Sequence, residues 1–102
     1  MALTGKQRAY LRGLAHHKNP VVMVGSAGVS DEVLQKVVVE LGLHELIKVK
    51  VGDAPIDVNE VAPLLVDGTG AELVQVIGHV VILYKKRKKN PEIRLPKASD
   101  PA

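Results

Sequence analysis

Residues Pro20–Ser30 read PVVMVGSAGVS, which is typical of a short apolar strand, a Gly-x-x-Gly loop and the start of a helix. A loop of glycine and small residues allows the backbone of another molecule to approach closely. In KH domains such a loop clamps a run of nucleotides by their sugar-phosphate backbone. The stretch therefore predicts either an RNA-binding loop at Gly25, Ser26, Ala27 and Gly28 or only a tight strand-to-helix turn that needs a positive φ.

The helix that follows the loop is predicted from its cap and its apolar spacing. Ser30 is the expected N-cap, and Gly42 is the expected C-terminal stop. The buried stripe is expected to comprise Val33, Leu34, Val37, Val38 and Leu41. Asp31 and Glu32 already compensate the helix dipole and would repel a phosphate placed at this N-terminus. We therefore expect any RNA contact to use the backbone of residues 25–28.

A first helix is predicted upstream, from a capping box at Thr4 and Gln7 to about His16. Its apolar face is expected to contain Leu3, Tyr10, Leu11 and Leu14. Arg8 and Arg12 lie four residues apart and off that face, so we expect them to point to solvent. Asn19-Pro20 ends the pattern before the strand at 21–24.

The segment 46–51 alternates apolar and basic residues, which predicts a strand with one buried and one basic face. A third helix is predicted from about Asp57 to Val66, ended by Gly68-Thr69-Gly70. Pro63 within it removes a hydrogen bond, so we expect a kink or a later start.

Two further strands are predicted at Leu73–Ile77 and Val80–Tyr84. Gly78-His79 between them suits a two-residue type II′ turn. Both strands are apolar on both faces, so we expect other elements to cover them. The order α-β-α-β-α-β-β predicts a single compact α/β domain over residues 1–96, followed by a flexible tail at 97–102.

Composition and charge narrow the function. The chain has 102 residues, no cysteine and no apolar run near the roughly 20 residues of a membrane span. The N-terminus has no apolar signal region, so we expect a cytoplasmic protein. The formal net charge is +3, but residues 1–24 carry +4, residues 51–78 carry −5 and residues 79–102 carry +5. This asymmetry predicts one phosphate-seeking face.

Three groups of basic residues are candidates for that face. The first group is expected beside the Gly-x-x-Gly loop and comprises Lys6, Arg8, Arg12 and Lys18. The second is an unbroken run that would bind phosphate without reading sequence and comprises Lys85, Lys86, Arg87, Lys88 and Lys89. A solubilising tail is the other interpretation of this run. Lys48 and Lys50 form a weaker third group, because their stems could instead pack under a helix.

Several chemistries are excluded by the motifs that the chain lacks. No Gly-Lys-Ser/Thr follows the loop, and no third glycine completes a dinucleotide fingerprint. The four histidines show no metal-ligand spacing, and no nucleophile or acid–base pair is evident. We therefore expect no catalytic residue, no metal and no cofactor. Tyr10 and Tyr84 are the only aromatic residues, too few for a base-stacking platform, which favours recognition of RNA by shape and charge.

The chain resembles the CRM domain (chloroplast RNA splicing and ribosome maturation), and more closely the stand-alone bacterial proteins of the YhbY type. The resemblance runs from about Leu3 to Pro96 and is carried by collinear blocks at Gln7–His16, Pro20–Val29, His44–Lys50, Val74–Gly78, Leu83-Tyr84 and Ile93–Pro96. It implies a four-stranded mixed sheet packed by helices, similar to the C-terminal domain of translation initiation factor 3. It also implies RNA binding through the Gly25–Gly28 loop and adjoining basic surface.

Stand-alone members of this family are associated with precursors of the large ribosomal subunit. The resemblance therefore implies a non-enzymatic RNA-binding protein that assists ribosome assembly. Two other functions stay open at this point. One is a protein-interaction module that docks a ribosomal protein or another partner, and the other is a DNA-binding protein, supported only by net charge.

Overall fold

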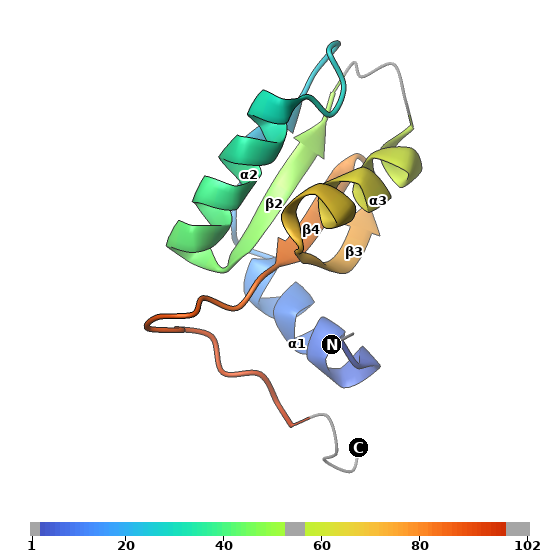
Figure 1. The fold of residues 1–102 in the computed structure, drawn as a ribbon. Helices are drawn as coiled ribbons and strands as arrows, with labels where there is room; N and C mark the ends of the chain where they lie inside the picture. The colour runs from blue at the N-terminus through green and yellow to red at the C-terminus, as the bar shows by residue number, and fades with distance from the viewer. Residues whose placement is uncertain (1–2, 53–56, 98–102) are drawn as a thin grey trace.

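The computed structural model describes residues 3–52 and 57–97 (Figure 1). Its elements follow the predicted order and are α1 (Gly5–Ala15), β1 (Val22–Val24), α2 (Asp31–His44), β2 (Leu46–Val51), α3 (Val58–Thr69), β3 (Glu72–Ile77) and β4 (Val80–Tyr84). The predicted α/β class is confirmed. Of the predicted tail at 97–102, all but Lys97 lies outside the described residues.

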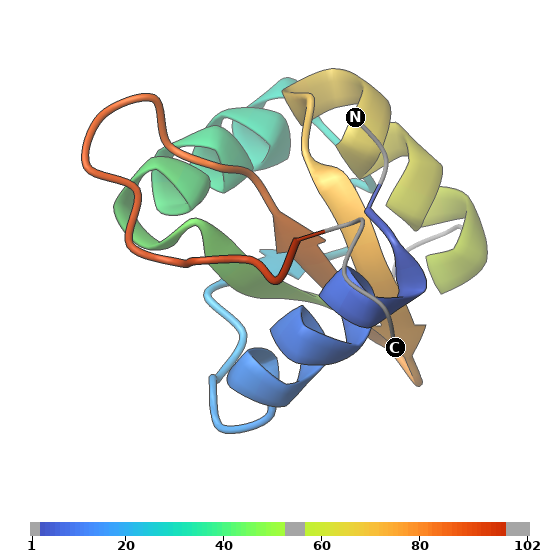
Figure 2. The ribbon, with the colours of Figure 1, turned by 90° about the horizontal axis from the view of Figure 1, so that it is seen from below.

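The four strands form one mixed sheet in the order β1-β2-β4-β3. β1 runs parallel to β2, whereas β4 is antiparallel to both β2 and β3. Helices α2 and α3 cover one face of this sheet, and α1 lies on the other (Figures 1 and 2). The parallel pair is joined through α2, as a parallel connection requires a crossover.

Each face of the sheet has its own hydrophobic core. The larger core lies under α2 and α3 and includes Val37, Leu41, Ile47, Val49, Val61, Leu65, Val81 and Leu83. The smaller core lies under α1 and comprises Leu3, Leu11, Ala15, Leu46, Val74, Ile82 and Tyr84. Ile93 and Leu95 pack against this smaller core, so the chain beyond β4 is part of the fold.

Helix α1 begins with the predicted capping box. The Thr4 hydroxyl accepts from the Gln7 N–H at 3.1 Å, and the Gln7 side chain accepts from the Thr4 N–H at 3.0 Å. The predicted apolar face is wrong in part, because Tyr10 and Leu14 are 42% and 40% exposed. The buried residues of the helix are Leu11 and Ala15, which belong to the smaller core.

Helix α2 begins as predicted, with the Ser30 hydroxyl accepting from the Val33 N–H at 3.2 Å. The predicted stop at Gly42 is wrong, since the helix continues to His44. Gly42 lies on an exposed surface and costs only its low helix propensity. The helix ends instead at Glu45, which adopts a positive φ of 60°. Val38, predicted as buried, is 49% exposed.

Helix α3 begins directly after Asp57, whose carboxylate accepts from the Asn59 N–H at 3.4 Å. It continues through Pro63 and ends at Thr69, three residues beyond the predicted end. Gly70 is the C-cap, with a left-handed φ of 75° that glycine adopts without strain.

The β3–β4 hairpin turns at Gly78, whose φ of 57° suits the predicted two-residue turn. β4 is covered on both faces from Val81 to Tyr84, which confirms the expectation for this strand. β3 lies at the edge of the sheet, and Ile77 at its end is 50% exposed, so the same expectation is wrong there. The hairpin and the loop after β1 lie at the same end of the sheet (Figure 1).

Candidate nucleic-acid interface

The loop after β1 is a tight turn closed by its own backbone. The Gly28 N–H donates to the Gly25 carbonyl at 2.9 Å, and the Ser30 N–H donates to the Gly28 carbonyl at 3.1 Å. Gly28 is buried and has a φ of 71°, which favours glycine. Its presence is therefore explained by the turn alone.

Gly25 is different from Gly28, because the fold does not require a glycine there. Its φ is not in the left-handed region, and a Cβ built on it would meet nothing within 4 Å. Ser26 and Ala27 beside it are exposed. Within the described part of the chain, the N–H groups of these two residues donate to no acceptor. The loop thus presents a small, open backbone with two available donors.

A row of side chains continues this surface across the sheet. Strand pairing joins Met23 to Lys50, Lys50 to Val80, and Val80 to Ile77. Met23 is 63% exposed, and Lys50 and Ile77 are also exposed. The row lies on the same face of the sheet as α1, and Ile77 lines a pocket together with Ala9, Arg12 and Gly13 of that helix. We call this row together with Gly25–Gly28 the loop-end surface.

Met23 and Ile77 are surface residues that were not predicted from the sequence. The position of Met23 between Val22 and Val24 could have indicated its exposure, because neighbouring residues of a strand point to opposite faces. Ile77 gave no such signal, since its exposure depends on where α1 ends over the sheet. Lys50, predicted as a weaker candidate, is the basic residue that strand pairing places nearest the loop, because its partner Met23 lies two residues before Gly25.

Three of the four bases predicted beside the loop, Lys6, Arg8 and Arg12, lie on α1. That helix lies toward the end of the sheet away from the loop (Figure 1). The Arg8 guanidinium donates to the Leu3 carbonyl at 2.8 Å and to the Leu73 carbonyl at 3.3 Å. Any RNA contact by these four residues stays a prediction.

Arg12 and Lys48 also form hydrogen bonds within the protein, although Arg8 and Arg12 are exposed as predicted. Arg12 donates to the Gln75 side chain at 3.1 Å. Lys48 is half-buried, with its Nζ 3.5 Å from the His16 carbonyl at the C-terminal end of α1. A cation is favourable at that position because the helix dipole is negative there. The interpretation that Lys48 packs under a helix therefore fits the structure better than a purely RNA-facing role.

The run Lys85–Lys89 is not a solvated tail. Lys85 donates to the Thr69 carbonyl at 2.8 Å, at the C-terminal end of α3. Arg87 donates to the carbonyls of Gly42 and Leu43 at the end of α2, at 3.4 and 3.3 Å. It also forms an ion pair with Glu92 at 3.1 Å. Lys86, Lys88 and Lys89 are exposed.

Glu45 holds this C-terminal segment, residues 85–97, against the domain. Its side chain is 0% exposed and accepts from the N–H groups of Arg87, Glu92 and Ile93 at 2.9, 2.6 and 2.9 Å. Burial alone would raise the pKa of the Glu45 carboxyl, but the three N–H donors and the Arg87 charge outweigh burial and lower that pKa below 4.5. Figure 2 shows the segment looping past α2 and returning toward α1, where Pro96 accepts from Gln7.

Tyr84 is a further polar side chain whose pKa is shifted. Burial, followed by the Glu45 charge, raises the pKa of the Tyr84 hydroxyl above 10. Tyr84 is 4% exposed, so Tyr10 is the aromatic ring left near solvent. Among residues 3–52 and 57–97, no group of three or more His, Asp or Glu side chains is placed to hold a metal ion. No helix in those ranges is long and apolar enough to cross a membrane.

The amino-acid sequence matches the model of a known protein family. The profile of the CRS1/YhbY (CRM) domain matches residues 3–85, which include the loop and all four strands. The chain belongs to the CRS1/YhbY (CRM) domain family. The CRM profile ends where the C-terminal segment begins.

Relatives extend the likeness beyond the CRM profile. A Bacillus subtilis protein named "Probable RNA-binding protein YqeI" is 45% identical over 92% of this chain and 99% of its own length. A Haemophilus influenzae protein named "RNA-binding protein" is 43% identical over 93% of this chain and 96% of its own. A solution structure of a Staphylococcus aureus protein superimposes with a TM-score of 0.80 at 42% identity, over 92% of this chain and 99% of that one.

Proposed function

We propose that this CRM-domain protein binds RNA through the loop-end surface and assists assembly of the large ribosomal subunit. One observation carries the proposal. The fold does not require a glycine at position 25, yet this residue lies next to the unbonded backbone N–H donors of the exposed residues Ser26 and Ala27. A backbone of this kind suits close contact with a sugar-phosphate chain. RNA-binding names among relatives that share nearly the whole chain support the same ligand.

The N–H groups at the top of the loop would donate to phosphate oxygens. Asp31 and Glu32 in the first turn of α2 would keep the phosphate over the loop and away from the helix N-terminus. Lys50 would add charge across the sheet, while Met23 and Ile77 would contact sugars or bases. Such contacts read shape more than sequence, which suits structured RNA.

The role in ribosome assembly rests on the resemblance to the stand-alone CRM proteins of the YhbY type, and the protein would act in the cytoplasm without catalysing a reaction. Gradient sedimentation of a cell extract tests this role directly. We expect the protein to sediment with precursors of the large subunit and to be released by high salt, because phosphate contacts weaken with salt. A protein that sediments with small-subunit particles, or stays at the top of the gradient at low salt, contradicts the role.

A salt titration tests RNA binding at the loop. Affinity for large-subunit ribosomal RNA is measured with duplex DNA as competitor, for the native chain and for Ser26→Asp/Ala27→Asp. This variant keeps both glycines and places two negative charges where phosphate should approach. We expect RNA affinity to fall by about tenfold or more, with circular dichroism unchanged.

A matched control adds the same charges elsewhere. Val39→Asp/Leu64→Asp changes two exposed residues on α2 and α3, which are 59% and 47% exposed. We expect this control to bind RNA within about threefold of the native chain. Equal losses in both variants would make the loop a structural turn. Equal affinity for duplex DNA and ribosomal RNA would favour a DNA-binding protein instead.

A further inference from the structure

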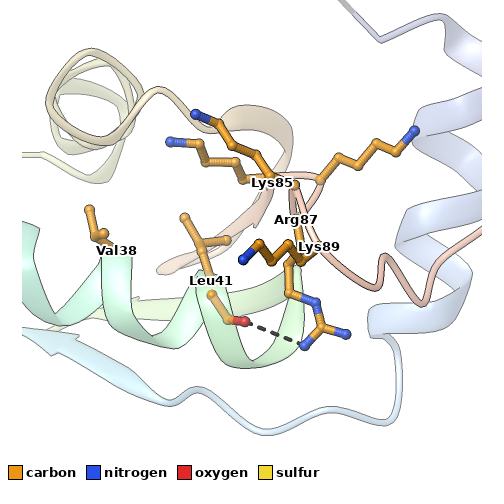
Figure 3. A pocket seen from close by; sticks show the side chains of 8 residues that line it. Val38, Leu41, Lys85, Arg87 and Lys89 are labelled. Atoms are coloured by element: carbon orange, nitrogen blue, oxygen red, sulfur yellow. Dashed lines mark hydrogen bonds between the residues drawn. The ribbon is translucent and has the colours of Figure 1, made fainter.

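A groove lies at the C-terminal end of α2, between that helix and the run Lys85–Lys89 (Figure 3). Its volume is about 410 Å³, and Val38, Leu41 and Gly42 line the side formed by α2. In Figure 3, Val38 and Leu41 rise from α2 toward the chain that carries Lys85. The RNA interface proposed above does not include any of these residues.

The floor of the groove is aliphatic, and Val38 is its exposed part, because Leu41 is only 2% exposed. Val38 is 49% exposed, although it lies on the stripe that the sequence predicted as buried. A Cβ at Gly42 would meet nothing within 4 Å, so this glycine widens the groove. An exposed aliphatic floor of this kind favours an apolar group that fills it.

The rim is basic and held in place. Arg87 donates to the Gly42 carbonyl, as the dashed line in Figure 3 marks, and its own N–H is bound by Glu45. Lys86, Lys88 and Lys89 are exposed, and within residues 3–52 and 57–97 they form no hydrogen bond or ion pair. Three available cations therefore project from a backbone that the fold has already ordered, which lowers the entropy cost of binding.

We propose that this groove binds an acidic peptide segment of a protein partner. An aliphatic side chain of the partner would lie on Val38, with flanking carboxylates on Lys86, Lys88 and Lys89. Charge selects an anionic partner, and the floor selects a peptide over RNA. The exposed aliphatic side chain of Val38 suits contact with a leucine or valine of the partner.

The groove and the Gly25–Gly28 loop lie at opposite ends of α2. The helix has 14 residues, which span about 20 Å at 1.5 Å per residue. One protein could therefore hold RNA at one end and an acidic segment at the other. The groove proposal does not depend on the proposed function, and the two can fail separately.

Fluorescence anisotropy with a labelled synthetic peptide tests the groove. The probe is a peptide of about twelve residues in which glutamates flank a central pair of leucines, at about 150 mM salt. Val38→Asp places a charge on the floor, and Val39→Asp is its matched control, because Val39 is 59% exposed and does not line the groove. We expect Val38→Asp to weaken peptide binding about tenfold and Val39→Asp to change it less than about twofold.

A second pair of variants, which have the same net charge as each other, tests the rim. Lys86→Gln/Lys88→Gln/Lys89→Gln removes the three available cations, and Lys18→Gln/Lys36→Gln/Lys97→Gln removes three exposed cations elsewhere. We expect the first to lose about tenfold in peptide affinity and the second about threefold or less. Ser26→Asp/Ala27→Asp should bind the peptide as the native chain does, even if it fails to bind RNA.

Three outcomes would overturn the proposal. One is equal binding of a control peptide whose leucines are replaced by serines, because attraction would then be purely electrostatic. Another is an equal effect of Val38→Asp and Val39→Asp. The third is a larger loss of affinity for a polyuridine oligonucleotide than for the peptide in Lys86→Gln/Lys88→Gln/Lys89→Gln. That result would assign the groove to RNA.

Discussion

The two ends of α2 show how differently the fold uses two regions that both look functional in the sequence. At the N-terminal end, the Gly25–Gly28 loop bonds mainly to itself and leaves donors at Ser26 and Ala27. At the C-terminal end, the chain beyond β4 is held by Glu45 and caps two helices through Lys85 and Arg87. The difference shows that a basic run indicates a binding surface only through those side chains that form no hydrogen bonds or ion pairs within the protein.

The largest expected effect is on stability, at the C-terminal end. Glu45→Ala leaves three backbone N–H groups without their charged acceptor, so we expect a loss of about 3 kcal/mol in the free energy of unfolding. Urea unfolding followed by circular dichroism measures it. Glu40→Ala on the same helix is the control and should cost about 0.5 kcal/mol or less. A loss below about 1 kcal/mol for Glu45→Ala would mean that the segment is not held by this carboxylate.

Acid should weaken the same end of the molecule. Because the folded-state pKa of Glu45 is lowered, its stabilisation is fully present above pH 4.5 and is lost as pH falls through the lower folded-state value. Glu45→Gln, which cannot ionise, should be about 1 to 2 kcal/mol less stable than the native chain at neutral pH. The gap should close in acid, as measured by urea unfolding over a pH series. A gap that stays constant with pH would contradict the assigned pKa direction.

The two loop glycines are expected to have different roles, Gly28 in the stability of the turn and Gly25 in RNA binding. Gly28→Ala forces alanine into a φ of 71° and should cost about 1 kcal/mol. Gly25→Ala should leave unfolding unchanged within about 0.5 kcal/mol, because a Cβ there meets nothing. If the RNA backbone approaches Gly25, this variant should still bind RNA several-fold more weakly in the same titration. Unchanged RNA affinity would remove Gly25 from the interface.

The smallest expected effect concerns single cations. Lys50→Gln, on the loop-end surface, should lower the slope of log affinity against log salt by about one. Arg8→Gln should leave that slope unchanged, because the Arg8 guanidinium is bonded to two carbonyls of the protein, and should cost about 1 kcal/mol of stability. A lower slope for Arg8→Gln, together with an unchanged slope for Lys50→Gln, would place the RNA on α1 instead.

The sequence was sufficient wherever a local pattern decides the structure. The Thr4–Gln7 capping box, the Ser30 cap and the alternation around Lys48 and Lys50 depend on neighbours within a few residues, and each was predicted. The turn glycine at Gly78 belongs to the same group.

The sequence was insufficient wherever distant residues decide the structure. The donors that bind Glu45 lie 42 to 48 residues away, so no local pattern marked this acid as buried or the basic run as ordered. The exposure of Val38 depends on where the chain beyond β4 passes α2. The candidate loop could be found from its glycines, but the open row from Met23 to Ile77 required the strand register.

Two variants of equal net charge test most directly whether the loop end, and not overall charge, binds RNA. Ser26→Asp/Ala27→Asp and Lys88→Ala/Lys89→Ala each lower the formal net charge from +3 to +1. Both are titrated with large-subunit ribosomal RNA at the same salt. We expect the loop variant to bind about tenfold more weakly than the native chain and the other variant about threefold more weakly or less. Equal losses, or a greater loss in the lysine variant, would contradict RNA binding at the loop.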